Sequence, residues 1–144
     1  MLKTQLQSDL NKKMGRLEGV LNGSIDKGVS FPIHSIGQEL AAYFRGDLRE
    51  FKTPLHLLGT PFQKRVWKEL KKIPYGTCVS YSFLAEAIGK PKAYRAVANA
   101  NASNSLPIMI PCHRVIYADS SLGGYNSGVE RKKWLIEHES AFAL

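Results

Sequence analysis

The clearest alternation of apolar and polar positions predicts a helix within TPFQKRVWKELKKIPYG, residues 60–76. Its apolar positions recur at helical spacing and predict a buried stripe: Phe62, Val66, Trp67 and Leu70. The other face is basic: Lys64, Arg65, Lys68, Lys71 and Lys72. Thr60 is a favourable N-cap and Pro61 suits the first helical position, while Pro74 and Gly76 are helix-stopping residues.

Two shorter helical patterns follow, SYSFLAEAIGK over 80–90 and PKAYRAVANANAS over 91–103. Gly89 ends the first and Pro91 stands near the start of the second. Two short helices joined by a tight turn predict a helix-turn-helix. The second helix is rich in alanine, whereas a helix packed in a core would carry larger apolar residues. Because small side chains let a helix backbone approach a duplex closely, we expect this helix to contact DNA.

The flanking regions give weaker patterns. Residues 34–47 predict an amphipathic helix that ends at Gly46, and residues 47–60 a connector. The segments TCVSY and RVIY predict short strands. Residues 129–142 predict a closing helix. Its expected inward-facing residues are Val129, Trp134, Leu135 and Phe142. The first 30 residues are polar and predict at most a marginal helix.

Length and charge narrow the class of protein. A chain of 144 residues with 44% hydrophobic residues is long enough for one domain with a core. It has no run of about 18 apolar residues and no secretory signal, so we expect a cytoplasmic protein, nucleoid-associated in a prokaryote or nuclear in a eukaryote. The net charge of +8 favours a polyanionic partner.

The two cysteines, Cys78 and Cys112, are expected to be free thiols, because disulfides are rare in reducing compartments. A metal site is not expected. No Cys-x-x-Cys motif occurs, and the four histidines show no ligand spacing. We interpret Cys78 as a core residue, since free cysteine often fills interior space.

Cys112 has neighbours that favour chemistry. His113 is a titratable base, Arg114 is a permanent cation, and a cationic surrounding favours the nucleophilic thiolate. Adjacent side chains on a regular strand point to opposite faces, so Cys112 and His113 cooperate only if the chain turns or a water links them. Pro111 favours such a turn. Glu139 is a candidate for the carboxylate that orients the histidine.

These residues carry a family resemblance. PCHRVI, the preceding NxxPIxI, GGYxxG and KKWLIEHE resemble motifs of the O6-alkylguanine-DNA alkyltransferases, in order and spacing. The segment from Gly59 to Ala100 resembles the region that precedes their active site. The resemblance implies an α+β, mostly helical fold: a winged-helix-like alkyltransferase domain with a helix-turn-helix over 55–144, preceded by a shortened N-terminal segment over 1–54. No cofactor is implied.

The resemblance also implies a role for individual residues. Cys112 takes an alkyl group irreversibly from O6 of guanine in double-stranded DNA. His113 is the base, acting through a water, and Glu139 orients it. Tyr125 and Tyr81 donate hydroxyls to the guanine, and Asn104 is a hinge residue. The remaining substrate-binding residues are Arg114, Val115, Asn126 and Ser127.

The implied partner is the minor groove of duplex DNA, read with little sequence preference by a monomer. Arg95 fills the space of the flipped nucleotide. Further DNA contacts are expected from Tyr94, Ala96, Asn99 and Tyr81. Asn101 and Ala102 depart from bulkier or basic residues in some members, which bears on DNA affinity.

Three alternatives remain at this point. A damage sensor would bind O6-alkylguanine DNA without transfer, although sensors of this kind carry tryptophan at the cysteine position. A helix-turn-helix transcription factor would bind specific sequences and protect its thiol. A cysteine hydrolase would turn over a small acyl substrate and would not need the basic surface.

Overall fold

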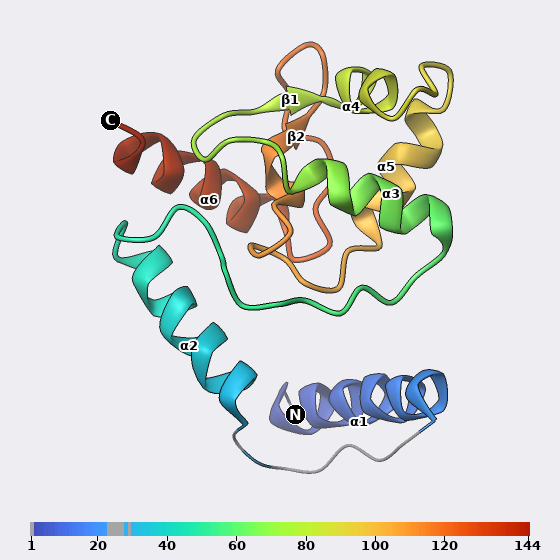
Figure 1. Cartoon of the computed structure of the whole chain (residues 1–144), viewed down its shortest axis with the longest axis vertical. Helices are drawn as coiled ribbons and strands as arrows, with labels where there is room; N and C mark the ends of the chain where they lie inside the picture. The colour runs from blue at the N-terminus through green and yellow to red at the C-terminus, as the bar shows by residue number, and fades with distance from the viewer. Residues whose placement is uncertain (1, 23–27, 29) are drawn as a thin grey trace. The chain divides into compact units, whose positions relative to one another are not determined.

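The computed structural model describes residues 2–22, 28 and 30–144. The chain forms two compact units, one ending at His34 and the other running from Ser35 to Leu144. Figure 1 shows the elements of each unit in chain order. No described helix is both long enough and apolar enough to cross a membrane.

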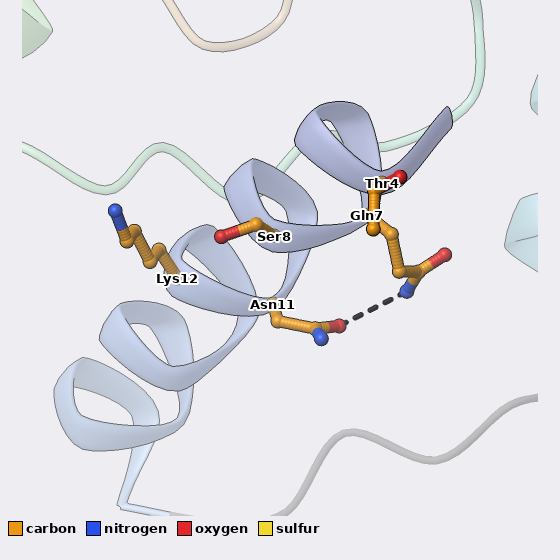
Figure 2. A pocket seen from close by; sticks show the side chains of 5 residues that line it. All are labelled: Thr4, Gln7, Ser8, Asn11 and Lys12. Atoms are coloured by element: carbon orange, nitrogen blue, oxygen red, sulfur yellow. Dashed lines mark hydrogen bonds between the residues drawn. The ribbon is translucent and has the colours of Figure 1, made fainter. Parts of the chain in front are cut away.

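The first unit is built on α1 (Leu2–Leu21), which covers the segment for which we expected a marginal helix. One face is polar and exposed, as Figure 2 shows for Thr4, Gln7, Ser8, Asn11 and Lys12. Nε2 of Gln7 donates to Oδ1 of Asn11 at 3.0 Å. The hollow along this face is bounded by exposed side chains of a single helix, so we assign it no function.

Helix α2 (Phe31–Phe44) confirms the helix expected near 34–47 and starts three residues earlier. Gly46 follows it with a φ of +82°. At that position a Cβ atom would lie 2.3 Å from the ring of Phe142, so glycine allows the close approach of this turn to the last helix. Tyr43, near the end of α2, is fully buried.

Helix α3 (Pro61–Leu70) has the predicted start. The side chain of Thr60 accepts from the backbone N–H of Gln63, and the Gln63 side chain accepts from the N–H of Thr60. This capping box satisfies two N–H groups that a helix start otherwise leaves unpaired. Val66, Trp67 and Leu70 are buried as the stripe predicts, and Phe62 is partly buried against them.

The helix-turn-helix is present as α4 (Tyr81–Ala87) and α5 (Tyr94–Ala102). Ser80 caps α4, and Gly89 in the turn has a φ of +71°. Indole Nε1 of Trp67 donates to the carbonyl of Ala100 at 2.8 Å, which fixes α5 against α3. The core beneath these helices includes Leu70, Leu84, Ile88, Val97, Ile110 and Val115.

The two predicted strands are short and pair in parallel, β1 (Val79–Ser80) with β2 (Val115–Ile116). Val79 lies opposite Val115, and Ser80 opposite Ile116. Mostly helical with this small sheet, the chain has the α+β fold class that we expected. The strand pair brings the start of α4 beside the segment that follows Cys112.

Helix α6 (Val129–Phe142) closes the chain, and the prediction of its inward face was largely wrong. Leu135 is buried, but Val129, Trp134 and Phe142 are 46%, 49% and 43% exposed. The buried face instead carries three polar residues: Lys132, His138 and Glu139. Each finds a polar partner in the fold, which removes most of the cost of burying it. The Trp134 ring stacks on His138 with centroids 4.8 Å apart.

Candidate active site

Cys112 begins a short 3-10 turn, η1 (Cys112–Arg114), so the chain does turn where Pro111 predicts. The N–H of Cys112 donates to the carbonyl of Ile110 at 2.8 Å, and the N–H of Arg114 donates to that of Pro111 at 3.0 Å. Cys112 is 4% exposed and belongs to the core cluster. The thiol is therefore held by a defined backbone.

The surroundings of Cys112 keep its thiol protonated. Burial raises the pKa of Cys112, while hydrogen bonds with the Asn104 and Tyr125 side chains and the charge of Lys132 act in the opposite direction. Burial and the neighbouring Cys112 raise the pKa of Tyr125, so its hydroxyl stays a donor. A base is needed before the sulfur can act as a thiolate.

The next residue, His113, carries a basic ring nitrogen. Nε2 of His113 lies 2.6 Å from Oε1 of Glu139, and both side chains are buried. A carboxylate partner holds the proton on Nε2 and leaves Nδ1 as the basic nitrogen. Nδ1 is buried and has no hydrogen-bond partner among the described residues. Burial lowers the pKa of His113, so the imidazole is neutral and able to accept a proton.

Glu139 is held from several directions. Arg114 donates from Nε to Oε2 at 2.8 Å and from NH2 to Oε1 at 3.0 Å. The N–H of Gly76 reaches Oε2 at 3.0 Å, and the Tyr43 hydroxyl reaches Oε1 at 2.8 Å. Burial alone would raise the pKa of the Glu139 carboxyl, but these donors and His113 hold it well below its ordinary value. Glu139 therefore stays ionised beside His113.

We expected Arg114 beside the sulfur of Cys112, but its side chain lies against Glu139. Its guanidinium pairs with Glu139 and donates from NH1 to the carbonyl of Ile73 at 2.6 Å. The cation that lowers the pKa of Cys112 is Lys132, which donates from Nζ to the carbonyl of Leu122. Our sequence reasoning missed Lys132. Its separation of seven residues from Glu139, two helical turns, places both on one face of α6 and was the available signal.

Two asparagines join α5 and the following turn to the segment of the nucleophile. Nδ2 of Asn104 donates to the carbonyl of Ile110 at 2.8 Å, and its Oδ1 accepts from the N–H of Leu106 at 3.0 Å. Nδ2 of Asn101 donates to the carbonyl of Cys112 at 3.3 Å. Asn101, which departs from the bulkier or basic residues of some family members, is buried.

Tyr81 is the buried first residue of α4. Nζ of Lys132 lies 5.9 Å from the centre of its ring, and the Tyr117 ring lies 5.3 Å away. Burial raises the pKa of Tyr81, followed by the charges of Tyr117 and Cys112. Cys112 thus contributes to the raised pKa of both Tyr81 and Tyr125, as expected for two tyrosines that lie close to the same cysteine.

A cavity of about 300 Å³ opens beside this site. Its lining comprises Phe44, Pro107, Ile108, Tyr125, Ser127, Arg131, Trp134 and Leu135. Tyr125 and Ser127 were among the predicted substrate-binding residues. Two others lie elsewhere: Asn126 donates to the carbonyl of Ala102, and the Val115 side chain is in the core. Ile108 has a φ of +74°, which is unusual for a β-branched residue.

Four of the five residues expected to contact DNA lie on the exposed face of α5, whereas the fifth, Tyr81, is buried at the start of α4. Tyr94, Arg95, Ala96 and Asn99 are exposed, while Val97, Ala100 and Asn101 face the core. The Arg95 guanidinium lies 5.8 Å from the centre of the Tyr94 ring. Within residues 2–22, 28 and 30–144, no group of three or more His, Cys, Asp and Glu side chains is arranged to hold a metal ion.

Comparison with known proteins agrees with this arrangement. Residues 61–141 match the family described as "6-O-methylguanine DNA methyltransferase, DNA binding domain". Methylated-DNA–protein-cysteine methyltransferase from Mycobacterium tuberculosis is 51% identical over 105 residues, which cover 73% of this chain and 64% of that protein. The constitutive enzyme of that name from Bacillus subtilis is 50% identical over 103 residues, 71% of this chain and 62% of that protein.

Solved structures give the same result. The crystal structure of Mycobacterium tuberculosis OGT in complex with DNA has a TM-score of 0.75 and 48% identity, covering 76% of this chain and 68% of that one. A buried Cys-His-Glu arrangement beside a helix-turn-helix thus occurs in a chain that belongs to the 6-O-methylguanine DNA methyltransferase family. The match spans just under two thirds of the length of both curated relatives.

Proposed function

We propose that this protein transfers an alkyl group from O6 of guanine in DNA to the sulfur of Cys112, once per molecule. The observation that carries the proposal is the buried pair of neutral His113 and ionised Glu139 directly after Cys112 in the chain, with Nδ1 of His113 left without a partner among the described residues. The family match supports the same reaction.

The reaction balances with the residues present. The Cys112 proton passes through a bridging water to Nδ1 of His113, which becomes an imidazolium paired with Glu139. The sulfur bonds to the alkyl carbon as the carbon–O6 bond breaks, and the bonding electrons move into the guanine. Tyr81 and Tyr125 offset the charge that develops there by donating hydrogen bonds. Tyr81 passes a proton to the leaving base, and the proton that His113 took from Cys112 replaces it by way of solvent, so that guanine leaves neutral. The resulting thioether is stable, so the protein is consumed.

DNA is proposed to bind across α5. The exposed Ala96 and Asn99 let this helix approach the minor groove, where base pairs are hard to distinguish. A repair protein benefits from such weak sequence preference. The target nucleotide must leave the stack, at a cost of about a few kcal/mol, and Arg95 offsets part of it by filling the gap. The protein acts as a monomer, and residues 55–144 carry both DNA binding and transfer.

The test is intact mass spectrometry after incubation with a duplex that carries one O6-methylguanine. We expect one methyl group in place of one hydrogen, mapped to Cys112 and absent with undamaged DNA. Cys112→Ser should remove the gain and keep DNA binding. Cys78→Ser is the matched control and should react like the parent protein. No mass gain with binding selective for the damaged duplex would instead indicate a damage sensor.

A further inference from the structure

A further role falls to Tyr43, which lies before the matched residues 61–141. Tyr43 is fully buried near the end of α2. Its hydroxyl donates to Oε1 of Glu139 at 2.8 Å, and its backbone carbonyl lies 2.8 Å from Nε2 of His138. Two consecutive residues of α6 therefore hold Tyr43 at both its backbone and its hydroxyl.

The bond to Glu139 falls on the oxygen that matters for the base. Oε1 is contacted by His113 Nε2 at 2.6 Å, Tyr43 Oη at 2.8 Å and Arg114 NH2 at 3.0 Å. A carboxylate oxygen that accepts from three donors attracts the proton of each donor less strongly than an oxygen that accepts from fewer. The hydroxyl remains a donor throughout the working pH range, because burial and then Glu139 raise the pKa of Tyr43 far above its ordinary value.

We propose that Tyr43 is a positioning residue of the transfer reaction, which acts through Glu139 to limit how strongly the carboxylate attracts the proton of His113. The inference rests on the proposed function, since it assigns Tyr43 to the same reaction. The contribution of Tyr43 is to keep His113 neutral, so that Nδ1 is ready to accept the thiol proton.

The other charged and titratable groups that face Tyr43, Glu139 and His113 are Arg114 of η1, Lys132 and His138 of α6, and Tyr75 and Cys78 from the segment before β1. All of them except Tyr75 are the same in every variant compared. Tyr75 is useful here. Its ring lies 6.1 Å from that of Tyr43, and its hydroxyl is buried but has no hydrogen-bond partner in the described part of the chain.

The experiment compares Tyr43→Phe with Tyr75→Phe in the full chain. Each change deletes one buried phenolic hydroxyl, but only the first removes a donor from Glu139. We measure the second-order rate of transfer from a methylated duplex between pH 5 and pH 9, a range of about two units on either side of neutrality. The His113 pKa is measured separately by NMR of the imidazole ring, without DNA.

Tyr43→Phe should raise the pKa of His113 by about 0.5–1 unit, because a carboxylate with one donor fewer stabilises the imidazolium more. The acidic limb of the rate profile, where the rate falls because His113 becomes protonated, should shift to higher pH by the same amount. At high pH, where His113 is neutral in both proteins, the rates should agree within about twofold. Tyr75→Phe should leave both measurements as in the parent chain.

Two results would overturn the proposal. One is an unchanged His113 pKa in Tyr43→Phe, and the other is an equal loss of rate at every pH, which a merely structural role would produce. Thermal unfolding checks that the variant is folded, and measurement in the cold keeps a weakened variant native. If the parent protein transfers nothing, the proposed function fails, while the NMR titration still decides whether Tyr43 acts on His113.

Discussion

Asn101 on α5 and Cys112 in the η1 turn are joined by a hydrogen bond, from Nδ2 of the asparagine to the carbonyl of the cysteine at 3.3 Å. Both residues are buried. The helix proposed to contact DNA is thereby hydrogen-bonded directly to the backbone of Cys112. A displacement of α5 on DNA binding would therefore move the Cys112 backbone through this hydrogen bond.

Asn101→Ala should therefore lower the free energy of unfolding by about 1–3 kcal/mol, since it leaves a buried carbonyl without its donor. Transfer from free O6-benzylguanine should also slow, because the carbonyl that positions Cys112 loses a restraint. Chemical denaturation and single-turnover kinetics measure the two effects. Asn99→Ala on the exposed face of the same helix is the control and should leave stability nearly unchanged. Equal stability of the two variants would contradict this prediction.

Gly76→Ala should destabilise the fold and disturb Glu139. Gly76 has a φ of +75°, and a Cβ there would lie 2.6 Å from Cβ of Ala143. The left-handed conformation alone costs a non-glycine residue about 1–2 kcal/mol. Because the N–H of Gly76 donates to Glu139, a shift of this turn also weakens that bond. The midpoint of thermal unfolding checks the expectation.

Gly124→Ala serves as the control for Gly76→Ala, since a Cβ at Gly124 would meet no atom within 4 Å. The two variants should differ clearly in their unfolding temperatures. A Gly76→Ala protein as stable as Gly124→Ala would show that the turn at residue 76 relaxes freely.

Stability should fall as the solution becomes acidic, in two stages. The pKa of His113 is lowered in the folded chain by burial, so the unfolded chain takes up this proton first. Its contribution to stability is present above the ordinary histidine pKa of 6.5 and is lost as the pH falls below it. The pKa of Glu139 is also lowered, and its contribution is lost as the pH falls below the ordinary glutamate value of 4.5.

Urea denaturation at a series of pH values measures this dependence. His113→Asn should flatten the first stage, whereas His56→Asn, which changes an exposed histidine, should not. A stability that is level between about pH 7.5 and pH 5.5, one unit on either side of the ordinary histidine pKa of 6.5, would contradict the buried neutral state of His113.

Arg95→Ala should slow the reaction on duplex DNA by about tenfold or more, while reaction with free O6-benzylguanine stays close to that of the parent protein. The arginine is exposed on α5 and is proposed to fill the gap left by the flipped nucleotide. Lys68→Ala, another exposed cation, should weaken duplex binding only through charge and should lose its effect in high salt. Equal losses for Arg95→Ala on both substrates would remove the role in flipping.

Local signals in the sequence explain why the helix-turn-helix and α3 could be predicted. Thr60, Pro61 and Gly89 act within a few residues of their own position, so capping and turn rules apply directly. The turn at Cys112 was likewise foreseeable from Pro111. The family motifs then placed His113 and Glu139 together, and the 2.6 Å contact confirms that they meet.

The inward face of α6 and the surroundings of Glu139 could not be predicted in the same way. Tyr43 and Glu139 are 96 residues apart, and nothing local indicates that they bond. Lys132 and His138 are residue types that usually lie at the surface. Hydrogen bonds to carbonyl groups outside α6 offset the cost of burying them. Trp134 is apolar by type but covers His138 at the surface instead of filling the core.

The parallel pairing of β1 with β2 has a consequence for protein engineering. Tyr81 directly follows β1 and Cys112 stands just before β2, so the two backbone pairs set their separation. The exposed residues 118–121 lie beyond β2, where the N–H of Tyr117 donates to the carbonyl of Ser121 and closes the turn. A peptide inserted into this turn would leave the pairing of Val79 with Val115 and of Ser80 with Ile116 unchanged, so the spacing between Tyr81 and Cys112 would be kept.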